Sequence, residues 1–326
     1  MQVDHRMLED LRRFNHKLAR APRFAYRHRF MPLLGQALLR LTQLGADGRL
    51  RRAGIGVERL DALAGGLRVP VRVLRPAGTP RGIVLDIHGG GWVIGNPEMN
   101  DALNAAIVRA CGVMVVSVDY RLAPAASIQA MMDDCLAGAR WLLEGGLNGS
   151  AGLPVIVVGE SAGAHLAAAT LLRLKAWPAL LARLAGTVLY YGVYDLAGSP
   201  SLRNAGRETL VLDGPAMLPG LRLLTPGMSD SARRSSPLSP LYGDLTGMPP
   251  ALMFTGGRDP LRDDTLQMAA RWRQAAPAEL VDLPEAPHGL IHFPTAMGRA
   301  ACAHAHRWID ARLRATAPAP QAPSGA

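Results

Sequence analysis

The feature that most constrains the fold is a regular alternation of short apolar runs with longer Ala/Leu-rich stretches, which begins at Leu67. Runs such as 155–158 are apolar at consecutive positions, so a strand built from them needs cover on both faces. A mostly parallel sheet flanked on both sides by helices supplies that cover. The sequence therefore predicts an α/β architecture.

The expected elements follow this alternation along the chain. We expect strands at 67–74, 82–87, 113–119, 154–159, 186–192, 250–256 and 278–283, and helices at 98–111, 127–144, 161–176, 260–275 and 296–314.

Three regions fall outside the alternation and set the expected domain organisation. Residues 1–50 show helical periodicity and precede the first strand, so we expect an N-terminal helical segment followed by an α/β domain at 51–314. The proline-rich stretch 195–249 separates two strands, and such an excursion is usually a lid or binding element. The tail 315–326 has the composition of a disordered segment.

The strongest chemical signal is the pentapeptide 159–163, in which Gly159, Glu160, Ser161, Ala162 and Gly163 follow a strand and open a helix. This context is typical of a nucleophile elbow, a sharp turn that exposes the serine above the sheet while small residues let the backbones approach. The nearby helix N-terminus adds partial positive charge. We therefore predict that Ser161 is a nucleophile.

A second signal is the run His88, Gly89, Gly90, Gly91 and Trp92, directly after the strand 82–87. Consecutive glycines let main-chain N–H groups turn toward a developing oxyanion, to which the amide after the nucleophile adds another donor. A phosphate loop is the alternative, but neither Gly-x-Gly-x-x-Gly nor a terminal Gly-Lys-Ser/Thr is present. We expect His88 to be a structural loop residue.

A serine nucleophile needs a base that an acid orients. Asp259 follows the strand 250–256 and His288 follows the strand 278–283, so all three groups would lie at the carboxyl ends of parallel strands. Asp195, which follows another strand, is the alternative acid, whereas Asp263 and Asp264 are expected to be dipole partners or solvated.

The other histidines suggest no metal site. His292 lies four residues after His288, but Gly289 and Pro294 argue against a helix there, so we expect a supporting or core role. Of the rest, His165 is expected to pack in the core, and His304 and His306 to lie at the surface. No metal or organic cofactor is predicted.

Charge and cysteine usage narrow the partners and compartment. The net charge of +10 is concentrated in residues 1–60, which hold 13 Lys/Arg against 5 Asp/Glu. A basic helical arm could bind nucleic acid or an anionic membrane surface. Because no recognition fold or interleaved aromatics accompany it, we interpret the excess as a solvated helix face and predict no nucleic-acid partner, with membrane binding as the alternative left open. Three unclustered cysteines (Cys111, Cys135 and Cys302) and an N-terminus without a signal-peptide pattern favour the cytoplasm.

The motifs together resemble the hormone-sensitive-lipase-like branch of the α/β-hydrolase superfamily, which includes many bacterial esterases. The matching segments are 88–92, 119–124, 159–163, 237–264 and 287–290, in that order along the chain. The resemblance implies Ser161, His288 and Asp259 as catalytic triad, and Gly90, Gly91 and Ala162 as oxyanion donors. It also implies a helical cap, built from the N-terminal segment and an insertion at about 195–235. Residues 125–128 depart from the family pattern, and Asp119 and Arg121 are interpreted as ion-pair candidates.

Three functions are compatible with these motifs. The first is a serine carboxylesterase that hydrolyses short-to-medium-chain esters through an acyl-enzyme, with a small-molecule ester as its partner. The second is a non-catalytic small-molecule binder, which the presence of all three triad residues argues against. The third is a lyase or dehydratase on the same site. A homodimer is compatible with the sequence.

Overall fold

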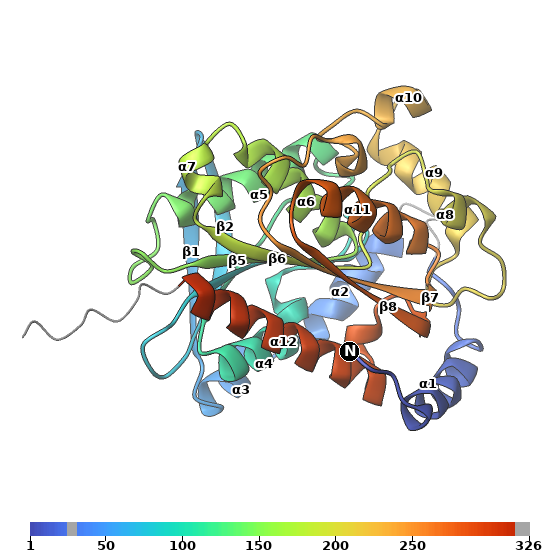
Figure 1. The fold of residues 1–326 in the computed structure, drawn as a ribbon, viewed down its shortest axis with the longest axis horizontal. Coiled ribbons are helices and arrows are strands. Elements are labelled where there is room, and N and C mark those ends of the chain that lie inside the picture. The colour runs from blue at the N-terminus through green and yellow to red at the C-terminus, as the bar shows by residue number, and fades with distance from the viewer. Residues whose placement is uncertain (25–30, 317–326) are drawn as a thin grey trace, which may run out of the picture.

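The computed structural model describes residues 1–24 and 31–316, apart from the side chains of 31–33, and its centre is one eight-stranded sheet (Figure 1). The strands are β1 (Gly56–Ala64), β2 (Leu67–Arg75), β3 (Ile83–Ile87), β4 (Met114–Val118), β5 (Val155–Glu160), β6 (Leu184–Tyr190), β7 (Ala251–Arg258) and β8 (Ala278–Pro287). Their order is β1-β2-β4-β3-β5-β6-β7-β8. β2 runs antiparallel to both neighbours, and the strands from β4 to β8 are parallel.

Helices cover both faces of the sheet. They are α1 (His5–Leu18), α2 (Met31–Thr42), α3 (Ala46–Arg52), α4 (Asp101–Cys111), α5 (Ile128–Leu143), α6 (Ala162–Leu174), α7 (Pro178–Leu181), α8 (Pro200–Asn204), α9 (Gly214–Leu224), α10 (Asp230–Arg233), α11 (Arg262–Ala275) and α12 (Ala296–Thr316), with one-turn 3₁₀ helices η1 (Pro97–Asn100), η2 (Pro240–Tyr242) and η3 (Leu290–His292). α5, α6 and α11 lie on one face, and α4 and α12 on the other (Figure 1). The fold is that of an α/β hydrolase, as predicted.

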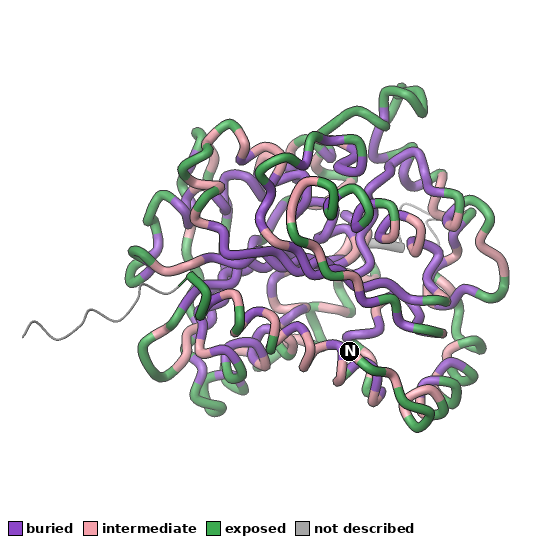
Figure 2. Tube along the Cα trace, viewed as in Figure 1, coloured by how far each residue is buried: buried purple, intermediate pink, exposed green. Residues whose placement is uncertain are grey.

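Two apolar clusters, one on each face, explain why the central strands read as continuous apolar runs. In β5, Val155 and Val157 belong to one cluster, while Ile156 and Val158 belong to the other. Successive side chains of a strand point to opposite faces, so both faces of β5 are buried. Figure 2 shows this buried band of strands inside a more exposed shell of helices and loops.

The edge strand β1 was missed by the sequence analysis, which began the sheet at Leu67. β1 carries Glu58, Arg59 and Asp61, none of which is buried, so it lacks the continuous apolar run of the central strands. Charged side chains are a common feature of edge strands because they discourage pairing with other chains. The remaining seven predicted strands are all present.

The two segments predicted outside the alternation are helical. Residues 1–50 contain α1 and α2 and most of α3, and the excursion between β6 and β7 contains α8, α9 and α10. α1 packs on α12 and β8, with Leu11 completely buried there. α12 extends to Thr316, so most of the tail predicted to be disordered lies outside the described residues.

Candidate active site

Ser161 occupies a sharp turn between β5 and α6. Its backbone has φ 52° and ψ −120°, a conformation that residues with a side chain rarely adopt. The turn is tight because a Cβ on Gly159 would lie 2.6 Å from the Gly163 oxygen, and one on Gly163 would lie 2.0 Å from the Ile87 oxygen. The Ser161 amide donates to the Tyr190 oxygen (2.9 Å), which ties the turn to the end of β6. The elbow geometry predicted from the pentapeptide is present.

Three side chains from distant parts of the chain form one hydrogen-bonded line at this turn. His288 Nε2 lies 2.9 Å from Ser161 Oγ, and His288 Nδ1 lies 2.8 Å from Asp259 Oδ2. The other Asp259 oxygen accepts from the Leu261 amide (2.8 Å), which fixes the carboxylate. Ser161, Asp259 and His288 each directly follow a strand, β5, β7 and β8 respectively, so the parallel sheet brings them to one edge.

Asp195, the alternative acid, is engaged elsewhere. One of its carboxylate oxygens accepts from Arg234 Nε (3.1 Å) and from the Tyr242 hydroxyl (3.0 Å). Asp264, expected to be a dipole partner or solvated, is instead buried and accepts from the amides of Tyr194 and Asp195. The structure therefore places Asp259, and not Asp195, beside the histidine.

The glycine run after β3 forms a turn close to the elbow. Gly90 (φ 98°) and Gly91 (φ 62°) have left-handed backbones, and a Cβ on Gly90 would lie 1.9 Å from the Ile94 oxygen. Ala162 is the first residue of α6, so its N–H has no carbonyl partner within the helix. These are the residues that the family resemblance implies as oxyanion donors.

His88 and Gly89 stabilise this turn from inside the core. The His88 ring is buried and stacks on Tyr120 with ring centres 4.2 Å apart, and its Nδ1 donates to the Gly89 oxygen (2.9 Å). The Tyr120 hydroxyl donates to the carbonyl oxygens of both His88 and Gly89. Burial lowers the pKa of His88 to about 4, so its imidazole is neutral near pH 7.

A second histidine–carboxylate pair lies beside the triad. His292 Nε2 is 2.6 Å from Glu160 Oε2, and the Tyr191 hydroxyl donates to the same oxygen (3.0 Å). Burial alone would raise the pKa of Glu160, but the charge and hydrogen bond of His292 hold it below the usual value. Burial opposes protonation of His292, yet Glu160 raises its pKa. His292 thus has the expected supporting role, through a partner that sequence spacing alone did not identify.

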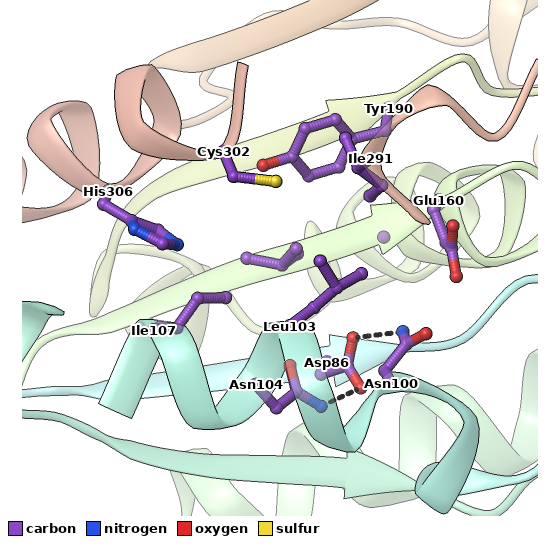
Figure 3. Close-up of a pocket in the computed structure, with 12 residues that line it drawn as sticks. Asp86, Asn100, Leu103, Asn104, Ile107, Glu160, Tyr190, Ile291, Cys302 and His306 are labelled. Atoms are coloured by element: carbon purple, nitrogen blue, oxygen red, sulfur yellow. Dashed lines mark hydrogen bonds between the residues drawn. The ribbon is translucent and has the colours of Figure 1, made fainter. Parts of the chain in front are cut away.

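A small cavity of about 20 Å³ lies behind the elbow, on the side of the sheet that α4 covers (Figure 3). Asp86 lines it and accepts hydrogen bonds from Asn100 (3.1 Å) and Asn104 (2.8 Å). Burial raises the pKa of Asp86 to about 6. The volume is sufficient for one water molecule, and Glu160 Oε1 at its edge has no hydrogen-bond partner among the described residues.

Two histidines on α12 are less exposed than the sequence-based expectation. His306 lines the same cavity and is half-buried, and His304 is half-buried with its Nε2 2.6 Å from Glu279, so neither is a fully exposed surface residue. His165 is buried as expected, where it accepts from Trp92 Nε1 (3.3 Å) and contacts the Leu238 oxygen (2.8 Å).

Arg121, predicted as an ion-pair candidate with Asp119 nearby in sequence, pairs with a residue on the next helix. Its guanidinium contacts both oxygens of Asp134, at 2.7 and 2.8 Å, and Asp134 is almost fully buried. This pair holds the segment after β4 against α5. The choice of partner depended on the packing of α5, which the local sequence does not reveal.

The N-terminal segment contacts the glycine-run turn directly. The Gln36 side chain on α2 accepts from the Gly95 amide (2.8 Å) and donates to the Gly95 oxygen (3.0 Å). Phe24 pairs with Leu212 of the excursion between β6 and β7, and its ring lies 3.7 Å from where a Cβ on Gly91 would be. The two helical segments of the expected cap therefore meet next to Gly91.

A serine on a strand-to-helix elbow, hydrogen-bonded to a histidine that is hydrogen-bonded to an aspartate, is typical of serine hydrolases of the α/β-hydrolase class. Residues 84–292 match the family described as alpha/beta hydrolase fold. The chain belongs to this family, in its hormone-sensitive-lipase-like branch.

Relatives and solved structures agree with this assignment. The chain is 34% identical over 254 residues to "Carboxylesterase NlhH" of Mycobacterium tuberculosis, a match that covers 75% of this chain and 78% of the relative. The crystal structure of esterase LipW from Mycobacterium marinum superposes with a TM-score of 0.79 at 28% identity, covering 92% of this chain and 95% of that one. An esterase from the bacterial hormone-sensitive lipase family gives a TM-score of 0.75 at 27% identity, covering 96% and 100%.

None of the helices in the described ranges has the length and apolar character that crossing a membrane requires.

Proposed function

We propose that the protein hydrolyses short-to-medium-chain carboxylic esters through an acyl-enzyme intermediate on Ser161. Its membership of the family and its esterase relatives make it a carboxylic-ester hydrolase. The observation that carries the mechanism is the unbroken line from Asp259 through His288 to Ser161, with both contacts between 2.8 and 2.9 Å.

Each residue has one chemical task in this proposal. His288 removes the proton from Ser161 Oγ as the oxygen attacks the ester carbonyl, and then donates it to the leaving alcohol. Asp259 holds the imidazole with its Nδ1 proton toward the carboxylate and stabilises the imidazolium. A water molecule, activated by the same histidine, then releases the acid and restores the serine.

The tetrahedral intermediate carries a negative charge on the former carbonyl oxygen. We assign the amides of Gly90, Gly91 and Ala162 as the donors that stabilise it, because the turn after β3 packs on the elbow, where a Cβ on Gly89 would lie 3.2 Å from the Glu160 oxygen, and because Ala162 begins a helix. Glu160, Gly159 and Gly163 support the elbow, and His88 and Gly89 support the oxyanion turn. No metal ion or organic cofactor has a role in these steps.

The proposed chain-length preference follows from the family resemblance, which implies a cap that would enclose the acyl group. Phe24 pairs with Leu212, and its ring lies 3.7 Å from the position that a Cβ on Gly91 would take. An acetyl-hydrolase of Streptomyces hygroscopicus is among the relatives (29% identity, covering 78% of this chain and 87% of the relative). We expect acyl chains of roughly two to eight carbons to react fastest, because a longer chain would need a larger enclosed pocket.

The test is a series of initial rates on p-nitrophenyl esters from acetate to palmitate, with Ser161→Ala as the matched inactive variant. The variant should lose about 10⁶-fold in kcat, the loss seen when a triad nucleophile is removed. If kcat/KM on the palmitate ester were comparable to that on the short-chain esters, with activation at an oil–water interface, the protein would be a lipase and not an esterase. Product analysis that finds elimination instead of hydrolysis would favour a lyase.

A further inference from the structure

The loop between β8 and α12 carries both histidines of the site. His288 reaches Ser161 and His292 reaches Glu160, so the loop contacts two consecutive residues of the elbow. The position of the general base therefore depends on how this loop is held at its own two ends.

The N-terminal helix α1 holds the first end at Glu285, three residues before His288. Arg12 makes a forked ion pair with the Glu285 carboxylate, with contacts of 2.6 to 3.1 Å. Asn15, which is only 3% exposed, donates from Nδ2 to the Glu285 backbone oxygen (2.8 Å). The Arg12 guanidinium lowers the pKa of Glu285, so the pair stays charged at neutral pH.

Glu285 is a position where the backbone needs external support. Its φ of 58° lies in the left-handed region, which residues with a side chain rarely adopt. A Cβ on Gly257 would lie 2.9 Å from the Glu285 nitrogen, so Glu285 also packs against the end of β7, two residues before Asp259. One residue thus touches the strand that precedes the acid and lies in β8, three residues before the base.

The same helix holds the second end of the loop. The Asp10 carboxylate accepts from the Ala296 amide (2.7 Å), at the start of α12, and the rings of Phe14 and Phe293 lie 5.0 Å apart. α1 is itself fixed by Leu11, which is completely buried. The side chains of α1 therefore bracket the loop that contains His288 and His292.

We propose that α1 is a clamp for the general base, with Asn15 and Arg12 as positioning residues that act on His288 through Glu285. The proposal rests on the esterase mechanism above and adds a role for α1 that differs from a lid over the substrate. A lid would alter substrate binding, whereas a clamp alters how well the histidine is aimed at the serine.

The test compares Asn15→Leu, which keeps the size of the side chain but removes the donor, with Arg12→Gln. Arg6→Gln, an exposed cation on the same helix, is the matched control. Displacement of a reacting group by about 1 Å costs about 10²-fold in rate, so we expect partial misplacement in Asn15→Leu to lower kcat about tenfold on p-nitrophenyl butyrate. Arg12→Gln should show a smaller loss in the same direction, with KM nearly unchanged in both and no change in Arg6→Gln.

A second readout does not depend on ester turnover. The downfield proton resonance of His288 Nδ1–H, assigned by its loss in Asp259→Asn, should shift or broaden in Asn15→Leu and stay in place in Arg6→Gln. A wild-type protein without esterase activity would contradict the proposed function while this measurement still tests the clamp.

Two results would overturn the clamp. The first is an unchanged kcat and an unchanged Nδ1–H resonance in both α1 variants, even if their melting temperature falls, since that pattern means a purely structural role. The second is a raised KM at constant kcat, which means that α1 acts on substrate as a lid.

Discussion

The nucleophile elbow and the histidine loop support the same reaction by different physical means. The elbow is fixed by backbone packing, because Gly159 and Gly163 leave no room for a Cβ against neighbouring carbonyls. The histidine loop is fixed by side chains of α1 that come from some 270 positions away in the sequence. One half of the site is thus set locally by the sheet, and the other half by a long-range contact.

This difference teaches where each half is vulnerable. Because main-chain atoms surround the glycines of the elbow closely, any atom added there must displace the backbone. A loop held by hydrogen bonds and an ion pair loses its supports one at a time. Substitutions at the elbow should therefore be all-or-none, whereas those around the loop should be graded.

After loss of the nucleophile itself, the largest effect is expected at the contact that orients the histidine. Asp259→Asn should lower kcat by about 10⁴-fold because an amide presents the wrong imidazole tautomer to the serine. Asp195→Asn, which removes charge from the pair with Arg234, should leave kcat nearly unchanged. Steady-state kinetics of the two variants decide the acid, and a crippled Asp195→Asn enzyme would show that the wrong carboxylate has been assigned.

At the elbow, Gly163→Ala should cost more than about 3 kcal/mol of folding free energy, since the new Cβ would lie 2.0 Å from the Ile87 oxygen. The unfolding free energy of the Gly163→Ala variant, measured by chemical denaturation, should fall by that amount, and little of the variant should be folded. A Gly163→Ala enzyme with wild-type stability and activity would mean that the elbow can relax, and the contrast with the loop would fail.

The pH dependence of stability should separate the two halves by its sign. His165 on the elbow helix has its pKa lowered by burial to about 4, so its contribution is present at pH 8 and is lost as the pH falls below 6.5. His292 on the loop has its pKa raised, chiefly by Glu160 acting against burial. The contribution of the His292 pair is therefore present near pH 5 to 6 and is lost as the pH rises through the raised pKa.

The measurement is the unfolding free energy of His165→Gln and His292→Gln between pH 5 and pH 8. The destabilisation by His165→Gln should shrink by about 1 to 2 kcal/mol toward pH 5, whereas that by His292→Gln should shrink toward pH 8. Parallel pH profiles for the two variants would contradict this assignment.

The smallest effect belongs to a glycine without close neighbours. Gly48 lies on α3, has no heavy atom within 4 Å of the position that a Cβ would take, and has no left-handed φ. Gly48→Ala should raise the melting temperature slightly, by the equivalent of about 0.5 to 1 kcal/mol. A loss of stability at this position would show that sensitivity to an added methyl group is not confined to packed glycines such as Gly163.

Much of the elbow half could be predicted from the sequence. Buried parallel strands are apolar at successive positions, and the residues that follow them carry the chemistry, so Ser161, Asp259 and His288 could be placed at one edge before their geometry was known. The two glycines of the pentapeptide are explained by the tightness of the turn, because a Cβ at either position would lie only 2.0 to 2.6 Å from a neighbouring carbonyl oxygen.

The contacts that support the histidine loop could not be predicted, because they join distant segments of the chain. Nothing near Asn15 in the sequence indicates that it meets the backbone of Glu285, and the amphipathic pattern of α1 suits a lid as well as it suits a helix docked on α12. β1 was missed for a related reason, since a charged edge strand gains its stability from pairing with β2 and not from its own apolar content.

The neutral amide contacts of α2 have a consequence for how the N-terminal segment responds to salt. Gln36 on α2 forms hydrogen bonds with Gly95, and Gln43, the residue after α2, exchanges two hydrogen bonds of 2.7 Å with Asn96. These contacts with the segment that follows the oxyanion turn involve no net charge. The Arg12–Glu285 pair, exposed by 55% at the arginine, is open to screening by ions. Rising ionic strength should therefore weaken the Arg12–Glu285 contact of α1 before it weakens the amide contacts of Gln36 and Gln43.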